Sequence, residues 1–151
     1  MNPLGTVEGA ERLVEIFGAW PSFHDAEILE LRLDRMGRGE FEGPTLDIRF
    51  HLYEGRQDAS LPSGVRWFNH TQATLRFENV KDIELTGFNH QNAILDLGFA
   101  DEGVHPSAPG LRAIRVSIQQ AFGLGGSLLC GSVEVAAVEA GCPPRSVYAE
   151  E

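Results

Sequence analysis

The sequence has little of what would place it in a membrane or in an oxidising compartment. No apolar run approaches the ~20 residues that a membrane-spanning helix needs. There are only two cysteines, Cys130 and Cys142, and the residues from Met1 to Arg12 lack a basic start followed by an apolar stretch. We therefore expect a cytoplasmic protein with reduced thiols, no export signal and no membrane partner.

Basic residues are also scarce. The chain has 12 lysines and arginines against 22 aspartates and glutamates, a formal net charge of −10 at pH 7. A field of this sign repels phosphate backbones, which argues against a nucleic-acid partner, and it steers basic proteins toward the surface. A simpler interpretation, in which the acidity only keeps the protein in solution, stays open.

Length and composition predict a single globular domain over residues 1–151. The 151 residues are 42% hydrophobic and 23% charged, values typical of one packed domain rather than of a disordered chain. Near the N-terminus, apolar residues recur at helical spacing over about 7–17, with Thr6 as a candidate cap and Gly18 as the expected end. One N-terminal helix is therefore expected.

After Pro21 the apolar period changes from 3.6 to 2, the period of a half-buried strand. Leu46, Ile48, Phe50 and Leu52, for example, alternate with polar residues. The same pattern predicts about seven strands between residues 28 and 138, at 29–33, 46–52, 73–78, 83–85, 94–99, 114–118 and 128–138. Loops are expected at 36–44, 55–64, 101–110 and 123–126, and a loosely held polar tail at 141–151.

Because the strands follow one another without intervening helices, antiparallel connections are favoured. The predicted fold class is α+β: a mainly antiparallel, curved β-sheet, either a sandwich or a half-barrel, with the N-terminal helix packed on it.

The most distinctive segment connects the helix to the first strand. It reads Trp20-Pro21-Ser22-Phe23-His24-Asp25-Ala26-Glu27. Aromatic residues in a connector usually pin it to a core, and His24 and Asp25 are suited to fixing a turn through hydrogen bonds. The segment also resembles the start of the immunity protein 50 family of bacterial polymorphic-toxin systems.

Two further blocks resemble that family, in the same order along the chain. The central block runs from Phe77 to Asn92, and the C-terminal block places Phe122-Gly123 before Gly131-Ser132-Val133-Glu134-Val135. The resemblance covers about Val14 to Val138. It implies an antidote that binds a cognate toxin and blocks it by occlusion without catalysis or a cofactor, and the charge argument above predicts that this toxin is basic.

The run Asn89-His90-Gln91-Asn92 concentrates amides around an imidazole. It has two interpretations, a recognition loop that faces a partner and a tight turn whose side chains bond their own backbone. With the connector, it supplies the residues that we expect at a partner-binding surface: Trp20, His24, Asp25, Glu27, Asn89, His90, Gln91 and Asn92.

Two other function classes stay open. The adjacent His24 and Asp25 suggest a small metal-dependent hydrolase, with His90 as a further ligand, although the histidines lack the helical or finger spacing of common metal motifs. A generic protein- or ligand-binding domain is the third class. We predict no catalytic residues and no enzyme activity, and the sequence leaves the oligomeric state open.

Overall fold

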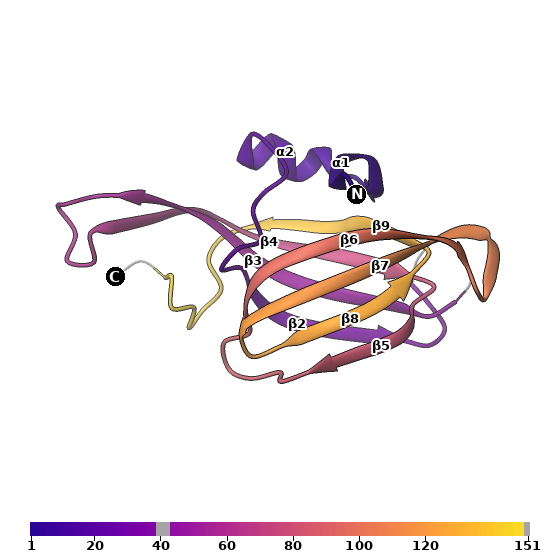
Figure 1. Cartoon of the computed structure of the whole chain (residues 1–151). Coiled ribbons are helices and arrows are strands. Elements are labelled where there is room, and N and C mark those ends of the chain that lie inside the picture. Colours follow the sequence, from indigo (N-terminus) through magenta and orange to yellow (C-terminus); the bar gives the residue numbers. More distant parts are fainter. Residues whose placement is uncertain (39–42, 150–151) are drawn as a thin grey trace.

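The computed structural model describes residues 1–38 and 43–149 (Figure 1). Residues 39–42 of the expected 36–44 loop and residues 150–151 of the expected tail lie outside the described part. No helix in the described residues is long and apolar enough to span a membrane.

The N-terminal region forms two short helices where one continuous helix was predicted over 7–17. They are α1 (Pro3–Thr6) and α2 (Glu11–Phe17), separated by the two-residue strand β1 (Val7–Glu8). The prediction was wrong for residues 7–10 because Gly9 adopts a left-handed φ of 77°, which interrupts the helix. The predicted end at Gly18 is confirmed: its φ is 82° and its N–H bonds the Val14 carbonyl.

The described residues, 1–38 and 43–149, form nine strands in one open sheet, with the order β1-β9-β4-β3-β2-β6-β7-β8-β5. All pairs are antiparallel except β1 with β9, which is parallel. Their bounds are β2 (Glu27–Asp34), β3 (Thr45–Gln57), β4 (Val65–Glu78), β5 (Lys81–Thr86), β6 (Ala93–His105), β7 (Ala108–Phe122), β8 (Gly125–Cys130) and β9 (Ser132–Ala140). The prediction of about seven strands missed β1 and the division of 128–138 at Gly131.

The expected loop at 101–110 is instead the end of the β6–β7 hairpin, which projects from the body of the protein (Figure 1). Its strands continue to His105 and resume at Ala108. Residues Asp101–Val104 are all exposed, so this stretch has no core face and its sequence carries no alternation between apolar and polar residues, whereas His105 at the turn is buried. The prediction failed there because the period-2 signal depends on one buried face.

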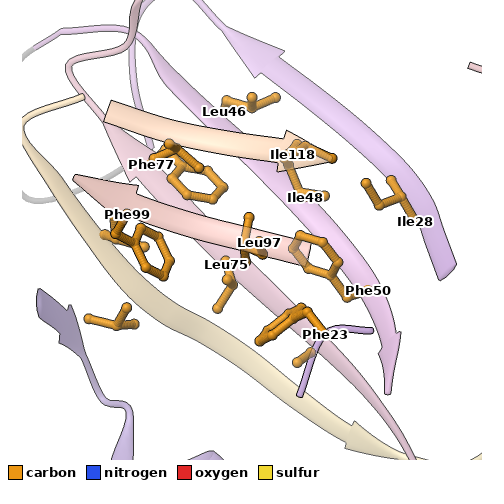
Figure 2. Close-up of a cluster of buried hydrophobic side chains, with 14 of the residues drawn as sticks. Phe23, Ile28, Leu46, Ile48, Phe50, Leu75, Phe77, Leu97, Phe99 and Ile118 are labelled. Carbon is orange, nitrogen blue, oxygen red and sulfur yellow. The ribbon is translucent and has the colours of Figure 1, made fainter. Parts of the chain in front are cut away.

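The sheet turns back on itself where β2 meets β6, through the single residue pair Glu27 and Ala93. The two sets of strands then face one another across the hydrophobic core (Figures 1 and 2). The predicted alternation in β3 is confirmed, since Leu46, Ile48, Phe50 and Leu52 are buried. Burying such a side chain stabilises the fold by about 1.5–3 kcal/mol. Because the core fixes the β3 backbone, it also fixes where the side chains on the outer face of β3 lie.

The connector after α2 closes one end of this core. The Phe23 ring lies 5.1 Å from the Phe50 ring, edge to face, and Trp20 lies 5.5 Å from Phe23 and 6.5 Å from Phe99. Figure 2 shows Phe23 beside Phe50. These aromatic contacts hold the turn that follows them in a fixed place.

Candidate functional site

The His24–Asp25 pair lies on the outside of this turn. The His24 Nδ1 atom is 3.1 Å from an Asp25 carboxylate oxygen, and both side chains are more than half exposed. The Asp25 backbone is fixed on both sides: its N–H donates to the Ile94 carbonyl at 2.8 Å, and its carbonyl accepts from the Tyr53 hydroxyl at 2.6 Å. Asp25 has a left-handed φ of 66°, which aspartate tolerates. The pair is thus a solvent-facing feature on a rigid turn.

The amide run at 89–92 forms a turn that is bonded by its own side chains. The Asn89 Oδ1 atom accepts from the N–H groups of Gln91 and Asn92 at 2.9 and 2.8 Å. The Asn92 side chain is buried; it accepts from the N–H groups of Asn89 and Leu124 and donates to the Ile28 carbonyl. The interpretation of this run as a self-bonded turn is therefore confirmed for Asn89 and Asn92.

Exposed aromatic side chains lie around His90, the histidine of this turn. His90 is exposed, and its ring meets the Phe122 ring edge to face at 5.7 Å. Phe88 and Phe122 are themselves 56% and 50% exposed. We call Phe88, His90 and Phe122 the aromatic patch. The backbone at Gly87 passes close to the backbone at Gly123. A Cβ atom added to Gly87 would lie 2.6 Å from the Gly123 carbonyl oxygen, so a side chain does not fit there.

A groove of about 260 Å³ runs between the aromatic patch and the C-terminal segment. Its lining consists of residues 27–29, 88–92 and 143–146. The structure thus brings Glu27 together with the predicted residues Asn89, His90, Gln91 and Asn92. Trp20 lies elsewhere, packed against Phe23 and Phe99.

Glu27, which lines this groove, begins a chain of buried and half-buried polar contacts. The β2–β3 register places Glu27 directly opposite His51, and their Oε1 and Nδ1 atoms are 2.6 Å apart. The other ring nitrogen of His51, Nε2, lies 2.9 Å from Nδ1 of His70 on β4. The side chains of His51 and Glu27 are 0% and 6% exposed. Burial strengthens such polar contacts, and breaking one is costly because the partner left behind cannot be solvated.

The C-terminal segment buries this chain of contacts. It was predicted to be a loosely held tail, which is wrong for residues 142–149. The Ser146 hydroxyl donates to Glu27 Oε1 at 2.5 Å, and the Tyr148 ring stacks on Tyr53 at 4.1 Å and meets Trp67 edge to face at 5.1 Å. Burial, with a hydrogen bond to Tyr148, raises the pKa of Tyr53 well above its usual value, so that its phenol stays protonated.

The residues of the described chain that are close enough to share a metal ion are His51, His70 and Cys142. One ligand atom from each lies within 4.8 Å of the others. Within that part of the chain, His24, Asp25 and His90 do not gather into such a group. This cluster was not among the predicted residues, although the alternation in β3 already placed His51 and Tyr53 together on the face opposite the core.

Comparison with known proteins gives one match. A family model described as immunity protein 50 matches residues 9–141, which is nearly the whole chain and encloses the predicted range of about 14–138. The predicted resemblance is confirmed. No curated protein and no solved structure matches the chain.

Proposed function

This chain belongs to the immunity protein 50 family, and we propose that it protects a bacterial cell by binding a cognate toxin in the cytoplasm and occluding it without turnover. The observation that carries the proposal is the family match across residues 9–141. The structure supports this proposal with a surface on which exposed aromatic and polar side chains are held by a fixed backbone.

We assign the contact surface to the aromatic patch, the groove beside it and the His24–Asp25 turn. These regions adjoin, since the Asp25 N–H bonds Ile94 and the Ile28 N–H bonds the Asn92 carbonyl. Exposed aromatic side chains on a fixed backbone are suited to anchoring a partner, because little conformational entropy is lost when they are covered. His90, Gln91, His24 and Asp25 supply polar contacts around them.

The other predicted residues have supporting roles in this proposal. Asn89 and Asn92 hold the loop through their backbone bonds, and Trp20 holds the turn through the core. Glu27 already accepts a hydrogen bond from Ser146 and faces His51. Its carboxylate is therefore assigned to shaping the groove rather than to chemistry, in keeping with a protein that binds and does not catalyse.

The charge of the chain favours a basic partner. The net charge is −10, and Glu8, Glu11 and Glu15 are exposed in the N-terminal region. Other acids of that region are neutralised locally, such as Glu30, whose carboxylate lies 3.3 Å from the Arg49 guanidinium. A negative field speeds association with a basic surface and discriminates against acidic competitors.

The proposal is tested by co-expression with the toxin encoded next to this chain, scored as growth rescue. We expect the unmodified chain to restore growth. Phe122→Ala should weaken the complex by at least about 2 kcal/mol, roughly 30-fold in Kd, if Phe122 is an anchor. Val104→Ala is the matched control, because Val104 is 67% exposed on the distant β6–β7 arm.

Rescue by the unmodified chain and by Val104→Ala, with loss in Phe122→Ala, supports both the function and the surface. Equal rescue by both variants removes the aromatic patch from the contact surface. Failure of the unmodified chain to bind the toxin or to restore growth contradicts the proposed function itself.

A further inference from the structure

We propose that His51, His70 and Cys142 bind a zinc ion, which fastens the C-terminal segment to the sheet. The inference does not depend on the toxin, because it concerns only this chain. It rests on the kinds of donor atom that the fold brings together, on their spacing and on the groups that orient them.

The donor set is suited to zinc rather than to magnesium or calcium. Two imidazole nitrogens and one cysteine sulfur are borderline-soft ligands, which zinc accepts and which hard, oxygen-preferring cations do not. The three come from β3, from β4 and from the segment just after β9. Residues this far apart in sequence converge only because the chain returns over the outer face of the sheet.

The spacing of the donor atoms fits a shared ion. The facing nitrogens of His51 and His70 are 2.9 Å apart, and one ligand atom from each of the three residues lies within 4.8 Å of the others. Typical zinc–nitrogen and zinc–sulfur bonds of about 2.0–2.1 and 2.3 Å in a tetrahedral site separate the donors by roughly 3.3–3.7 Å. That separation falls between the two observed limits, so small side-chain rotations suffice.

Glu27 orients the central ligand. Its carboxylate lies 2.6 Å from His51 Nδ1, which holds the proton on that nitrogen and leaves the lone pair of Nε2 directed toward His70. Pairing of a ligating histidine with a carboxylate is a general feature of protein zinc sites. The Ser146 hydroxyl, bonded to the same Glu27 oxygen, fixes the carboxylate in turn.

Aromatic rings lie beside the cluster, and its three protein donors leave the fourth tetrahedral position of the ion to water. Rings of Tyr53 and Tyr148 lie 5.0 and 6.4 Å from the ring of His51, which is buried, whereas His70 and Cys142 are half-buried. Cys142 is the residue immediately after the part of the chain that the family model matches. Zinc would therefore join the matched sheet to the segment that follows it.

The test is titration of the purified full chain with zinc alone and with cobalt alone. We expect one ion per chain. A thiolate-to-cobalt charge-transfer band should appear with the cobalt ion, because the proposed site contains a cysteine sulfur. Cys142→Ser should abolish that band, and His70→Gln should weaken zinc binding. Glu27→Gln, which keeps the shape of the side chain, should weaken zinc binding by about 10–100-fold.

Two matched controls separate this site from other thiols and histidines. Cys130→Ala removes a thiol that is buried in β8, where burial raises its pKa to about 12. His24→Gln removes an exposed histidine from the other candidate metal group. Both variants should bind zinc as the unmodified chain does. Circular dichroism of Cys142→Ser, an exchange in a half-buried segment, checks that the fold is retained.

Stoichiometric zinc with a cobalt–thiolate band that Cys142→Ser removes would support the site. Absence of zinc and cobalt binding by the folded, reduced chain would overturn it. Binding that survives both Cys142→Ser and His70→Gln would overturn it as well, because the ion would then be held elsewhere.

Discussion

Two histidine–carboxylate pairs in this protein differ in sequence separation, in the distance between their atoms and in exposure to solvent. His24 and Asp25 are adjacent in sequence, lie 3.1 Å apart, and have side chains that are 60% and 51% exposed. Glu27 and His51 come from neighbouring strands, lie 2.6 Å apart, and are almost completely buried. Water competes for the first pair and screens it, whereas the second pair depends on its own contacts.

The contrast separates a pair that adds little to the fold from a pair on which the fold depends. An exposed pair adds about 0–1 kcal/mol to stability, so His24 and Asp25 are free to be used in recognition. A buried pair is costly to break because the remaining partner cannot be solvated. Glu27 and His51 therefore determine whether the C-terminal segment, the groove and the outer face of β3 keep their arrangement.

The largest expected effect comes from removing the buried histidine. His51→Ala should lower the free energy of unfolding by about 3–5 kcal/mol, because it removes the imidazole that pairs with the buried Glu27 carboxylate, which keeps its bond from the Ser146 hydroxyl, and because it opens a cavity. Urea unfolding followed by circular dichroism measures the change, with His24→Ala as the matched control. A cost below about 1 kcal/mol for His51→Ala would show that the buried pair adds nothing to the fold.

A smaller effect is expected from the residue that ties the C-terminal segment to this pair. Ser146→Ala removes the hydroxyl that donates to Glu27 and should cost about 1.5–3 kcal/mol, the range for a hydrogen bond to a charged group. Amide hydrogen exchange should show the loss of protection in residues 142–149. Ser63→Ala, which removes an exposed hydroxyl bonded to the nearby Val65 backbone, is the control. Unchanged exchange in the segment would contradict the role of Ser146.

The smallest effect is expected at the exposed pair. His24→Gln should change the free energy of unfolding by no more than about 0.5 kcal/mol, because a solvated side chain is replaced by another. Thermal and urea unfolding measure this directly. A loss of more than about 2 kcal/mol would mean that the pair holds the turn, and the contrast between the two pairs would disappear.

The sequence predicts the surface pair and misses the buried one for a physical reason. His24 and Asp25 attract notice because they are adjacent. Glu27 and His51 meet only through the β2–β3 register, which shifts between Ile28 and Glu30. A one-residue slip in register would turn one of the two side chains to the other face, and sequence patterns do not locate such a shift.

The burial of His51 on the outer face of β3 was also not predictable from the sequence. Alternation in β3 correctly separated Phe50 from His51, but it does not show whether the face opposite the core is covered. What buries His51 is the return of residues 142–149, whose prolines and polar residues resemble those of an unattached tail. Tyr148 is the one residue there whose size suggests an anchor, and its partners Tyr53 and Trp67 lie far away in sequence.

Inhibition of a toxin by binding alone can be measured by titrating a fixed amount of the purified cognate toxin with this protein. Residual toxin activity should fall linearly, reach its minimum at a fixed molar ratio near one, and stay independent of incubation time once the complex has formed. Progressive inactivation of the toxin by substoichiometric amounts of the protein would contradict the account, because it would require turnover.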